Sequence, residues 1–191
     1  GIKADCPVKA IRDSYETIDG DGKNLTDEFV LPTVCAENGT ISSFVDKTAN
    51  REILGNEYNF NTFLMAEDVP DQWDNWDIDA DIQCKFKDAS NLVSREVVSV
   101  GAAAYIIRSE YKISAKSSVK QDMIFFADSA EVRFETVMDW KDDHRLLKVA
   151  FDTNVSDDFA RHEIQFGHVK RPTTRNNSIE EAKFEVVNHK Y

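Results

Sequence analysis

The sequence predicts an all-β fold, an antiparallel β-sandwich, from three observations. Apolar and polar side chains alternate along several segments in the second half of the chain, and an Asn-Gly pair marks a tight hairpin in the first half. Only one short segment suggests a helix. With 191 residues and 41% hydrophobic residues, the chain has enough material for one core, and each strand should bury one face and expose the other.

The first 28 residues are expected to form a linker or entry segment, and residues 29 to 191 a single β-sandwich domain. The entry segment is polar, and Asp19-Gly20-Asp21-Gly22 within it is a strong turn signal. We expect at most one strand there, around Val8 to Arg12. The strand pattern of the domain begins only after this segment.

A hairpin is predicted directly after the entry segment. Two strand-like runs, Phe29 to Ala36 and Thr40 to Asp46, flank the Asn38-Gly39 pair, which is the sequence signature of a tight hairpin turn. Lys47 to Asn50 predicts a second turn. A further strand, Tyr58 to Ala66, is then expected to lead into an acidic loop.

Four longer strands are predicted in the second half of the chain from their period-2 alternation. A helical interpretation would place Arg133 and Glu135 around the same cylinder as core residues, so the strand interpretation is preferred. The one helix candidate is Ser178 to Lys183, where Ser178 would cap the first turn with Glu181 three residues on. The four predicted strands are Tyr105 to Ile113, Val119 to Phe125, Val132 to Trp140 and Leu147 to Phe151.

Net charge and hydropathy narrow the classes of partner. The formal net charge of -12 argues against a nucleic-acid partner, because neutralisation of phosphates by cationic side chains supplies most of that affinity. The longest apolar run, Val97 to Ile107, is interrupted and falls well short of the roughly 20 apolar residues that a spanning helix needs. We therefore expect no nucleic-acid partner and no membrane segment.

The cysteines favour a reducing compartment. Cys6, Cys35 and Cys84 are odd in number, widely spaced and without a C-x-x-C pair. They are expected to be small buried hydrophobic residues. Together with the lack of a signal-peptide pattern, they favour a cytoplasmic location.

The usual catalytic and metal-binding motifs are not recognisable in this chain. It has no G-x-S-x-G elbow and no glycine-rich phosphate loop. Asp77 to Asp81 resembles the start of a calcium loop, but Ile82 stands where the turn glycine belongs and Asp88 where the bidentate glutamate belongs. The chain's histidines also lack the spacing of zinc ligands; they are His144, His162, His168 and His189. No catalytic residue and no metal ligand is therefore predicted.

The run from Glu67 to Asp79 is the strongest candidate for a binding loop. It places Trp73 and Trp76 three residues apart within a string of carboxylates. An exposed indole stacks on the apolar face of a sugar, while Asp74 and Asp77 accept hydrogen bonds from its hydroxyls. The alternative is that both rings plug the end of the sandwich or pack at a domain interface, and on sequence alone this packing interpretation is favoured.

The order of several segments resembles a known family. In the first half these are Asn38 to Lys47, Arg51 to Leu54 and Glu67 to Ile78; the later ones are Asp139-Trp140, Leu146 to Phe151, Glu163 to Gly167, Arg171 to Thr173, Ala182 to Val186 and His189-Lys190. From about residue 25 to residue 191, the chain resembles the region that follows the catalytic domain in glycoside hydrolase family 38 α-mannosidases.

This resemblance implies a fold, an activity and partners. Members are retaining exo-acting α-mannosidases with zinc and a nucleophilic aspartate in an N-terminal α/β domain, followed by helical and β-sandwich domains. The chain would then be a non-catalytic, truncated part of a galactose mutarotase-like β-sandwich, with no cofactor of its own. The implied partners are the catalytic domain of the same polypeptide, α-mannoside glycans and, through an exposed sheet edge, a second copy.

The resemblance also suggests two further sugar contacts and leaves two rival functions. Loops of the later domains lie near the active site in this family, so Arg171 and Arg175 join the candidate glycan-binding residues. The segment from Thr174 to Ala182 lacks the histidine and tryptophan that the family has there, which puts this loop's role in doubt. The rivals are a stand-alone carbohydrate-binding module and a mutarotase-like epimerase, and the epimerase would need a His and a Glu placed in a cleft.

Overall fold

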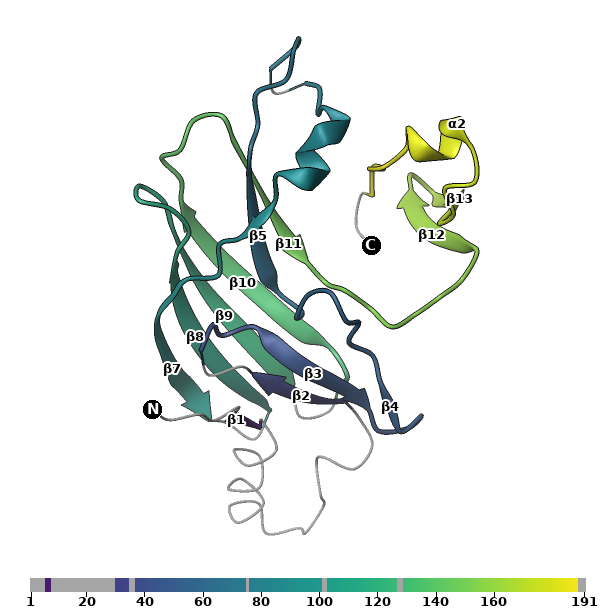
Figure 1. Ribbon diagram of the computed structural model, residues 1–191. Coiled ribbons are helices and arrows are strands. Elements are labelled where there is room, and N and C mark those ends of the chain that lie inside the picture. The colour runs from purple at the N-terminus through teal and green to yellow at the C-terminus, as the bar shows by residue number, and fades with distance from the viewer. Residues whose placement is uncertain are drawn as a thin grey trace.

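The computed structural model describes residues 6–7, 30–34, 37–74, 76–100, 103–126 and 129–188 (Figure 1). Within these residues almost all of the regular secondary structure is antiparallel β-strand, which confirms the predicted fold class. The largest sheet has the order β10-β9-β8-β7, a simple meander. Its strands are β7 (Leu92–Val100), β8 (Ala104–Lys112), β9 (Ser118–Phe126) and β10 (Val132–Asp139).

Two smaller sheets and a separate hairpin complete the strands. The first sheet has the order β1-β2-β3-β4 and comprises β1 (Cys6–Pro7), β2 (Val30–Val34), β3 (Ile41–Asp46) and β4 (Arg51–Glu52). The second has the order β11-β5-β6 and comprises β5 (Thr62–Glu67), β6 (Lys87–Asp88) and β11 (Arg145–Ala150). The hairpin pairs β12 (Phe159–Ile164) with β13 (Gly167–Pro172).

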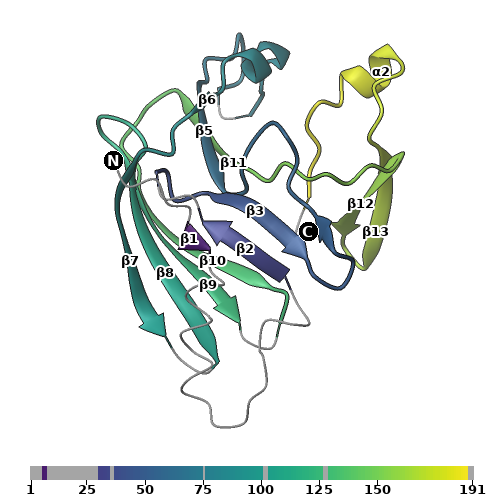
Figure 2. The ribbon, with the colours of Figure 1, turned by 60° about the horizontal axis from the view of Figure 1, so that its bottom comes forward.

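The two smaller sheets lie over the large one as the second layer of a sandwich. Strands β2 and β3 cross one end of the meander in both views, and β5 with β11 lies toward its other end (Figures 1 and 2). An antiparallel bridge between Ile41 and Phe60 joins the two small sheets, with reciprocal backbone hydrogen bonds of 2.9 and 3.0 Å. This bridge makes them one continuous layer.

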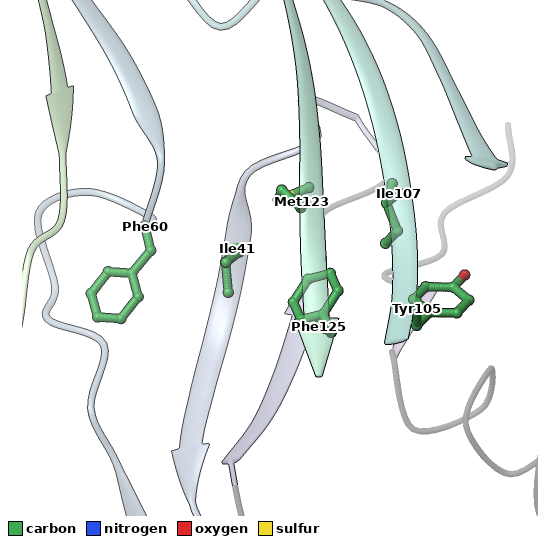
Figure 3. Close-up of a cluster of buried hydrophobic side chains, with 6 residues drawn as sticks. All are labelled: Ile41, Phe60, Tyr105, Ile107, Met123 and Phe125. Atoms are coloured by element: carbon green, nitrogen blue, oxygen red, sulfur yellow. The ribbon is translucent and has the colours of Figure 1, made fainter. Parts of the chain in front are cut away.

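The main core fills the space between the layers. Ile41 on β3 and Phe60 ahead of β5 face the inward side chains of β8 and β9, which are Tyr105, Ile107, Met123 and Phe125 (Figure 3). Along β8 every second residue is buried, as the period-2 pattern predicts. Arg108, on the outer side, instead makes two hydrogen bonds of 2.7 Å to the Asp122 carboxylate on β9.

A second cluster closes the other end of the sandwich. Phe63 on β5 packs edge-on against Tyr111 on β8, with ring centroids 5.0 Å apart, a geometry that aromatic pairs prefer. Ala89, Ile113 and Val119 complete this cluster. Both ends of the interface between the layers are therefore filled by apolar side chains.

One buried polar pair links the layers between the two apolar clusters. The Asn61 amide nitrogen donates to Gln121 Oε1 at 2.6 Å, and Gln121 Nε2 donates to Asn61 Oδ1 at 3.2 Å and to Thr136 Oγ1 at 3.0 Å. Asn61 and Gln121 are almost fully buried. Because each amide satisfies the other, the pair avoids the cost of an unpaired buried polar group.

The first predicted hairpin and the four later predicted strands are present, with every boundary within two residues of its predicted position. The strand predicted from Tyr58 to Ala66 is also present, as β5, but it begins only at Thr62. The predicted turn from Lys47 to Asn50 is also present. Gly39 takes φ +70°, the conformation for which the hairpin turn needs glycine. The predicted strand around Val8 to Arg12 and most of the entry segment lie outside the described residues.

Several elements were not predicted from the sequence. Strand β7 has register shifts at Leu92/Ser94 and Val97/Ser99, and these bulges break the alternation that would identify it. The apolar run from Val97 to Ile107 spans the end of β7 and the start of β8. The β12–β13 hairpin turns at Gln165-Phe166, without the Asn or Gly that signals such a turn.

Two sequence expectations were wrong in detail. The helix is present as α2 (Ser178–Glu181), but its N-cap is Asn177, whose side chain accepts hydrogen bonds from the backbone N–H groups of Ile179 and Glu180. Asn is as good a cap as Ser, and the helix simply begins one residue earlier than expected. Cys84 is exposed and free rather than buried, because it ends a short 3₁₀ helix, η1 (Ala80–Cys84), in which only Ile82 is buried.

The β12–β13 hairpin and α2 lie beside the sandwich, after a segment that leaves β11 (Figure 1). An ion pair between Lys148 on β11 and Glu185 after α2 connects this unit to the sandwich. Among the described residues, no helix is long and apolar enough to cross a membrane.

Candidate functional site

The tryptophan loop, residues 68 to 79, connects β5 to η1 (Figure 1). Trp73 takes φ +62°, and its carbonyl accepts hydrogen bonds from the N–H groups of Trp76 at 2.8 Å and Asp77 at 3.0 Å. At the base of the loop, the Asp71 N–H donates to Asp79 Oδ2 at 3.1 Å. These bonds fold the loop into a tight turn with both indoles near its tip.

Both tryptophan side chains are exposed. Trp73 is 71% exposed and Trp76 is 89% exposed, and among the described residues neither ring makes an aromatic or cation–π contact. The expectation that these rings plug the end of the sandwich was therefore wrong, and packing at a domain interface stays a prediction. Phe63 and Tyr111, not the tryptophans, belong to the second core cluster.

The carboxylates of the loop are only weakly neutralised. Asp74 Oδ2 lies 3.8 Å from His144 Nδ1, and both side chains are more than half exposed, so solvent screens this contact. Asp77 Oδ1 accepts from the adjacent Ile78 N–H at 2.9 Å. Asp81 on η1 pairs with Lys85 at 2.8 Å, and this hydrogen bond raises the pKa of the Lys85 ammonium. The tip remains strongly acidic.

The predicted arginines lie on a different part of the molecule. Arg171 is on β13, where its Nη2 donates to the Val187 carbonyl at 3.4 Å, and its buried Nε has no hydrogen-bond partner among the described residues. Arg175 is exposed between β13 and α2. In Figures 1 and 2 the β12–β13 hairpin and the tryptophan loop are separate, so the arginines do not lie with Trp73, Asp74, Trp76 and Asp77.

A depression of about 580 Å³ lies beside the tryptophan loop and was not anticipated from the sequence. Its lining includes the apolar residues Met65, Ala89 and Ile113. The charged and thiol groups that line it are Glu67, Cys84, Lys85, Lys87, Asp88 and Arg145. No motif marks these residues, because they come from β5, β6, η1 and β11 and meet only in the fold.

The described residues do not contain a cluster that fits a metal ion. No three side chains of His, Cys, Asp or Glu come together in a geometry that could hold one. The described residues therefore offer no ligand set for zinc.

The family of the chain follows from comparison with known proteins. A model of the glycosyl hydrolases family 38 C-terminal domain matches residues 26–191. The chain belongs to this family. This confirms the resemblance on which the sequence-based function rests.

Three relatives of this family 38 chain are α-mannosidases. It is 36% identical over 184 residues to α-mannosidase G of Dictyostelium discoideum, covering 93% of this chain and 17% of that protein. It is 32% identical over 176 residues to α-mannosidase 2C1 of Homo sapiens, covering 90% of this chain and 16% of that protein. It is 31% identical over 170 residues to an α-mannosidase of Saccharomyces cerevisiae, covering 83% of this chain and 16% of that protein. The chain spans about a sixth of the length of these relatives.

Proposed function

We propose that this chain is a non-catalytic β-sandwich part of a retaining α-mannosidase that hydrolyses terminal α-mannosyl linkages. Its role is to support a zinc-dependent catalytic domain outside these 191 residues. The family membership over residues 26–191 is the observation that carries this proposal. The partners are the catalytic domain and, through it, α-mannoside glycans.

A physical argument supports assigning the chemistry to another domain. Retaining hydrolysis needs a nucleophilic carboxylate and a general acid about 5 Å apart across the scissile bond. The described carboxylates with shifted pKa values are held in structural roles. Hydrogen bonds from Ser114 and Ser117 lower the pKa of Asp142, and Arg108 lowers the pKa of Asp122. Neither is a raised-pKa carboxyl suited to act as a general acid at neutral pH.

The direct test is an exchange of this segment in a relative. The matched 184-residue segment of Dictyostelium α-mannosidase G is replaced by this chain, or deleted, in the full-length enzyme. We expect the chimera to fold and hydrolyse a chromogenic α-mannoside, and the deletion variant to be inactive. A deletion variant with full activity would contradict the supporting role.

The isolated chain provides the complementary test. Incubated with the same α-mannoside and added zinc, it should give only the uncatalysed rate. Saturable hydrolysis that a chelator removes would place the catalytic apparatus within these residues and overturn the assignment.

The exposure of Trp73 and Trp76 favours a second candidate, a carbohydrate-binding role for the loop. Stacking of a pyranose on an exposed indole changes the fluorescence of the indole. Titration with α-mannosides should therefore give a saturable change in tryptophan fluorescence, and the double variant Trp73→Ala/Trp76→Ala should not show it. Trp140 remains as an internal reference. An unchanged spectrum at millimolar sugar would remove this candidate and leave the supporting role untouched.

A further inference from the structure

The β12–β13 hairpin is a basic element in an acidic protein. From Phe159 to Arg175 the chain has four cations, Arg161, Lys170, Arg171 and Arg175, and one carboxylate, Glu163, although the whole chain carries a net charge of -12. A local inversion of charge creates an electrostatic field that selects an oppositely charged partner.

Two of these cations face each other across the hairpin. Arg161 on β12 lies directly opposite Lys170 on β13 in the strand register, and both side chains are exposed. Among the described residues, neither forms an ion pair. Like charges directly opposite on antiparallel strands are destabilising, so this pair is unfavourable until an anionic group lies over it.

The tip of the same hairpin presents an aromatic side chain. Phe166 is fully exposed and takes φ +61°, a conformation that disfavours a bulky L-residue. Both its exposure and its backbone are costly in an isolated chain. A strained, exposed residue of this kind points to a binding role, because contact with a partner compensates for both costs.

The tryptophan loop is the complementary surface on the same chain. Residues 68 to 79 contain five carboxylates and no Lys or Arg. Trp73 and Trp76 are exposed among them, which gives this surface aromatic faces for a phenyl ring or a guanidinium group. The two surfaces therefore carry opposite charges, and each presents an exposed aromatic side chain that can pack against the other.

We propose that the β12–β13 hairpin docks on the tryptophan loop of a second copy of this chain. Arg161 and Lys170 then lie against the carboxylates of the loop, and Phe166 packs with the tryptophans. Because the two surfaces differ, the contact is heterologous: one copy keeps its tryptophan loop unused and the other keeps its hairpin unused. Successive copies close into a ring if the rotation between them permits.

This self-association does not depend on the proposed function, since it uses two surfaces of the chain itself. It does cover the tryptophan rings. A soluble α-mannoside that binds the loop would therefore compete with assembly, whereas a purely supporting role predicts no effect of sugar on assembly.

The test is a charge swap measured by sedimentation velocity. The purified chain should associate at about 20 mM salt and dissociate at about 500 mM, because exposed charge pairs are screened. Arg161→Glu/Lys170→Glu and Asp74→Lys/Asp77→Lys should each weaken association about tenfold or more. A mixture of these two variants should associate again, because each reversed surface then meets an oppositely charged one.

Matched controls separate loss of docking from loss of folding. The control for Arg161→Glu/Lys170→Glu is Lys112→Glu/Lys116→Glu, which makes the same change in net charge at two exposed lysines elsewhere. It should leave association within about twofold of that of the original chain. Phe166→Asn relieves the backbone conformation, so it should preserve or raise thermal stability while weakening association. Circular dichroism confirms that each variant is folded.

Three results would overturn the proposal. The first is that the chain stays monomeric at low salt and at protein concentrations up to about 1 mM. The second is that the charge reversals do not affect association. The third is that a mixture of the two folded variants does not associate. The first result would also leave both surfaces available to another domain of a longer polypeptide.

Discussion

Gly39 occupies a position that no other residue fills without rearrangement. Its φ is +70°, and a Cβ atom added there would lie 2.6 Å from the Tyr111 hydroxyl. That hydroxyl donates to the Gly39 carbonyl at 3.2 Å, which ties the first hairpin to the second core cluster. One glycine therefore serves both the turn and the closure of the sandwich.

We expect Gly39→Ala to lower the free energy of unfolding by about 2 kcal/mol or more. The alanine must adopt a left-handed backbone conformation, and its Cβ atom must displace the Tyr111 ring. Urea denaturation measures the change. Gly167→Ala is the matched control, because a Cβ atom there meets nothing within 4 Å, and its effect should stay within about 0.5 kcal/mol. Equal effects of the two substitutions would contradict this account.

Asp142 links stability to pH. The hydroxyls of Ser114 and Ser117 each donate to its carboxylate at 2.5 Å, and these bonds lower its pKa below 3.8 in the folded state. A lowered folded pKa contributes stability that is present well above pH 3.8 and is lost as the pH falls through the folded value.

Asp142→Asn should therefore reduce stability at pH 7, and the difference from the original chain should shrink below about pH 3.8. The measurement is the urea midpoint at a series of pH values. In a Ser114→Ala/Ser117→Ala background, the pH dependence of that difference should largely disappear. A difference that stays constant down to pH 2 would show that Asp142 does not titrate in this way.

At the scale of elements, the Asn61–Gln121 pair holds the two layers together. Gln121→Met leaves the buried Asn61 amide without its partner, so we expect a loss of about 1–3 kcal/mol in the free energy of unfolding. Lys120→Met, on the exposed face of the same strand, is the control and should change stability by about 0.5 kcal/mol at most. A near-zero effect of Gln121→Met would mean that water replaces the lost partner.

The predictability of each element from sequence depended on how regular its strand is. Strands β8 and β9 alternate without interruption and were predicted within one residue of their observed bounds. The bulges of β7 hide its alternation, and the β12–β13 turn places Phe166 where the usual signal is Asn or Gly. Irregular backbone is decided by tertiary contacts, which local sequence patterns do not encode.

The candidate site was partly predictable. The composition of the tryptophan loop identified it as unusual, but the exposure of Trp73 and Trp76 depends on where the folded chain places the loop. The depression beside the loop joins residues from β5, β6, η1 and β11, and only the folded topology brings them together.

At the scale of the whole molecule, protection against hydrogen exchange should follow the layers. The central strands β8 and β9 carry most of the buried side chains and should exchange only by global unfolding. The β12–β13 hairpin lies outside both clusters and should exchange faster by local opening. Mass spectrometry of peptides after deuterium labelling tests this order, and equal protection of the hairpin and β9 would contradict it.

The pairing of β5 with β11 also constrains how the chain folds during synthesis. Glu67 pairs with Arg145 and Thr62 with Ala150, so the two partners are about 80 residues apart, with the entire β7–β10 meander between them. At about 5–20 residues per second, the ribosome needs roughly 4 to 16 s to deliver the second partner after the first. The meander, whose contacts are local, has time to form before then. Its apolar inner face must wait for the second layer, so this interval is when the nascent chain is most exposed to aggregation and most in need of a chaperone.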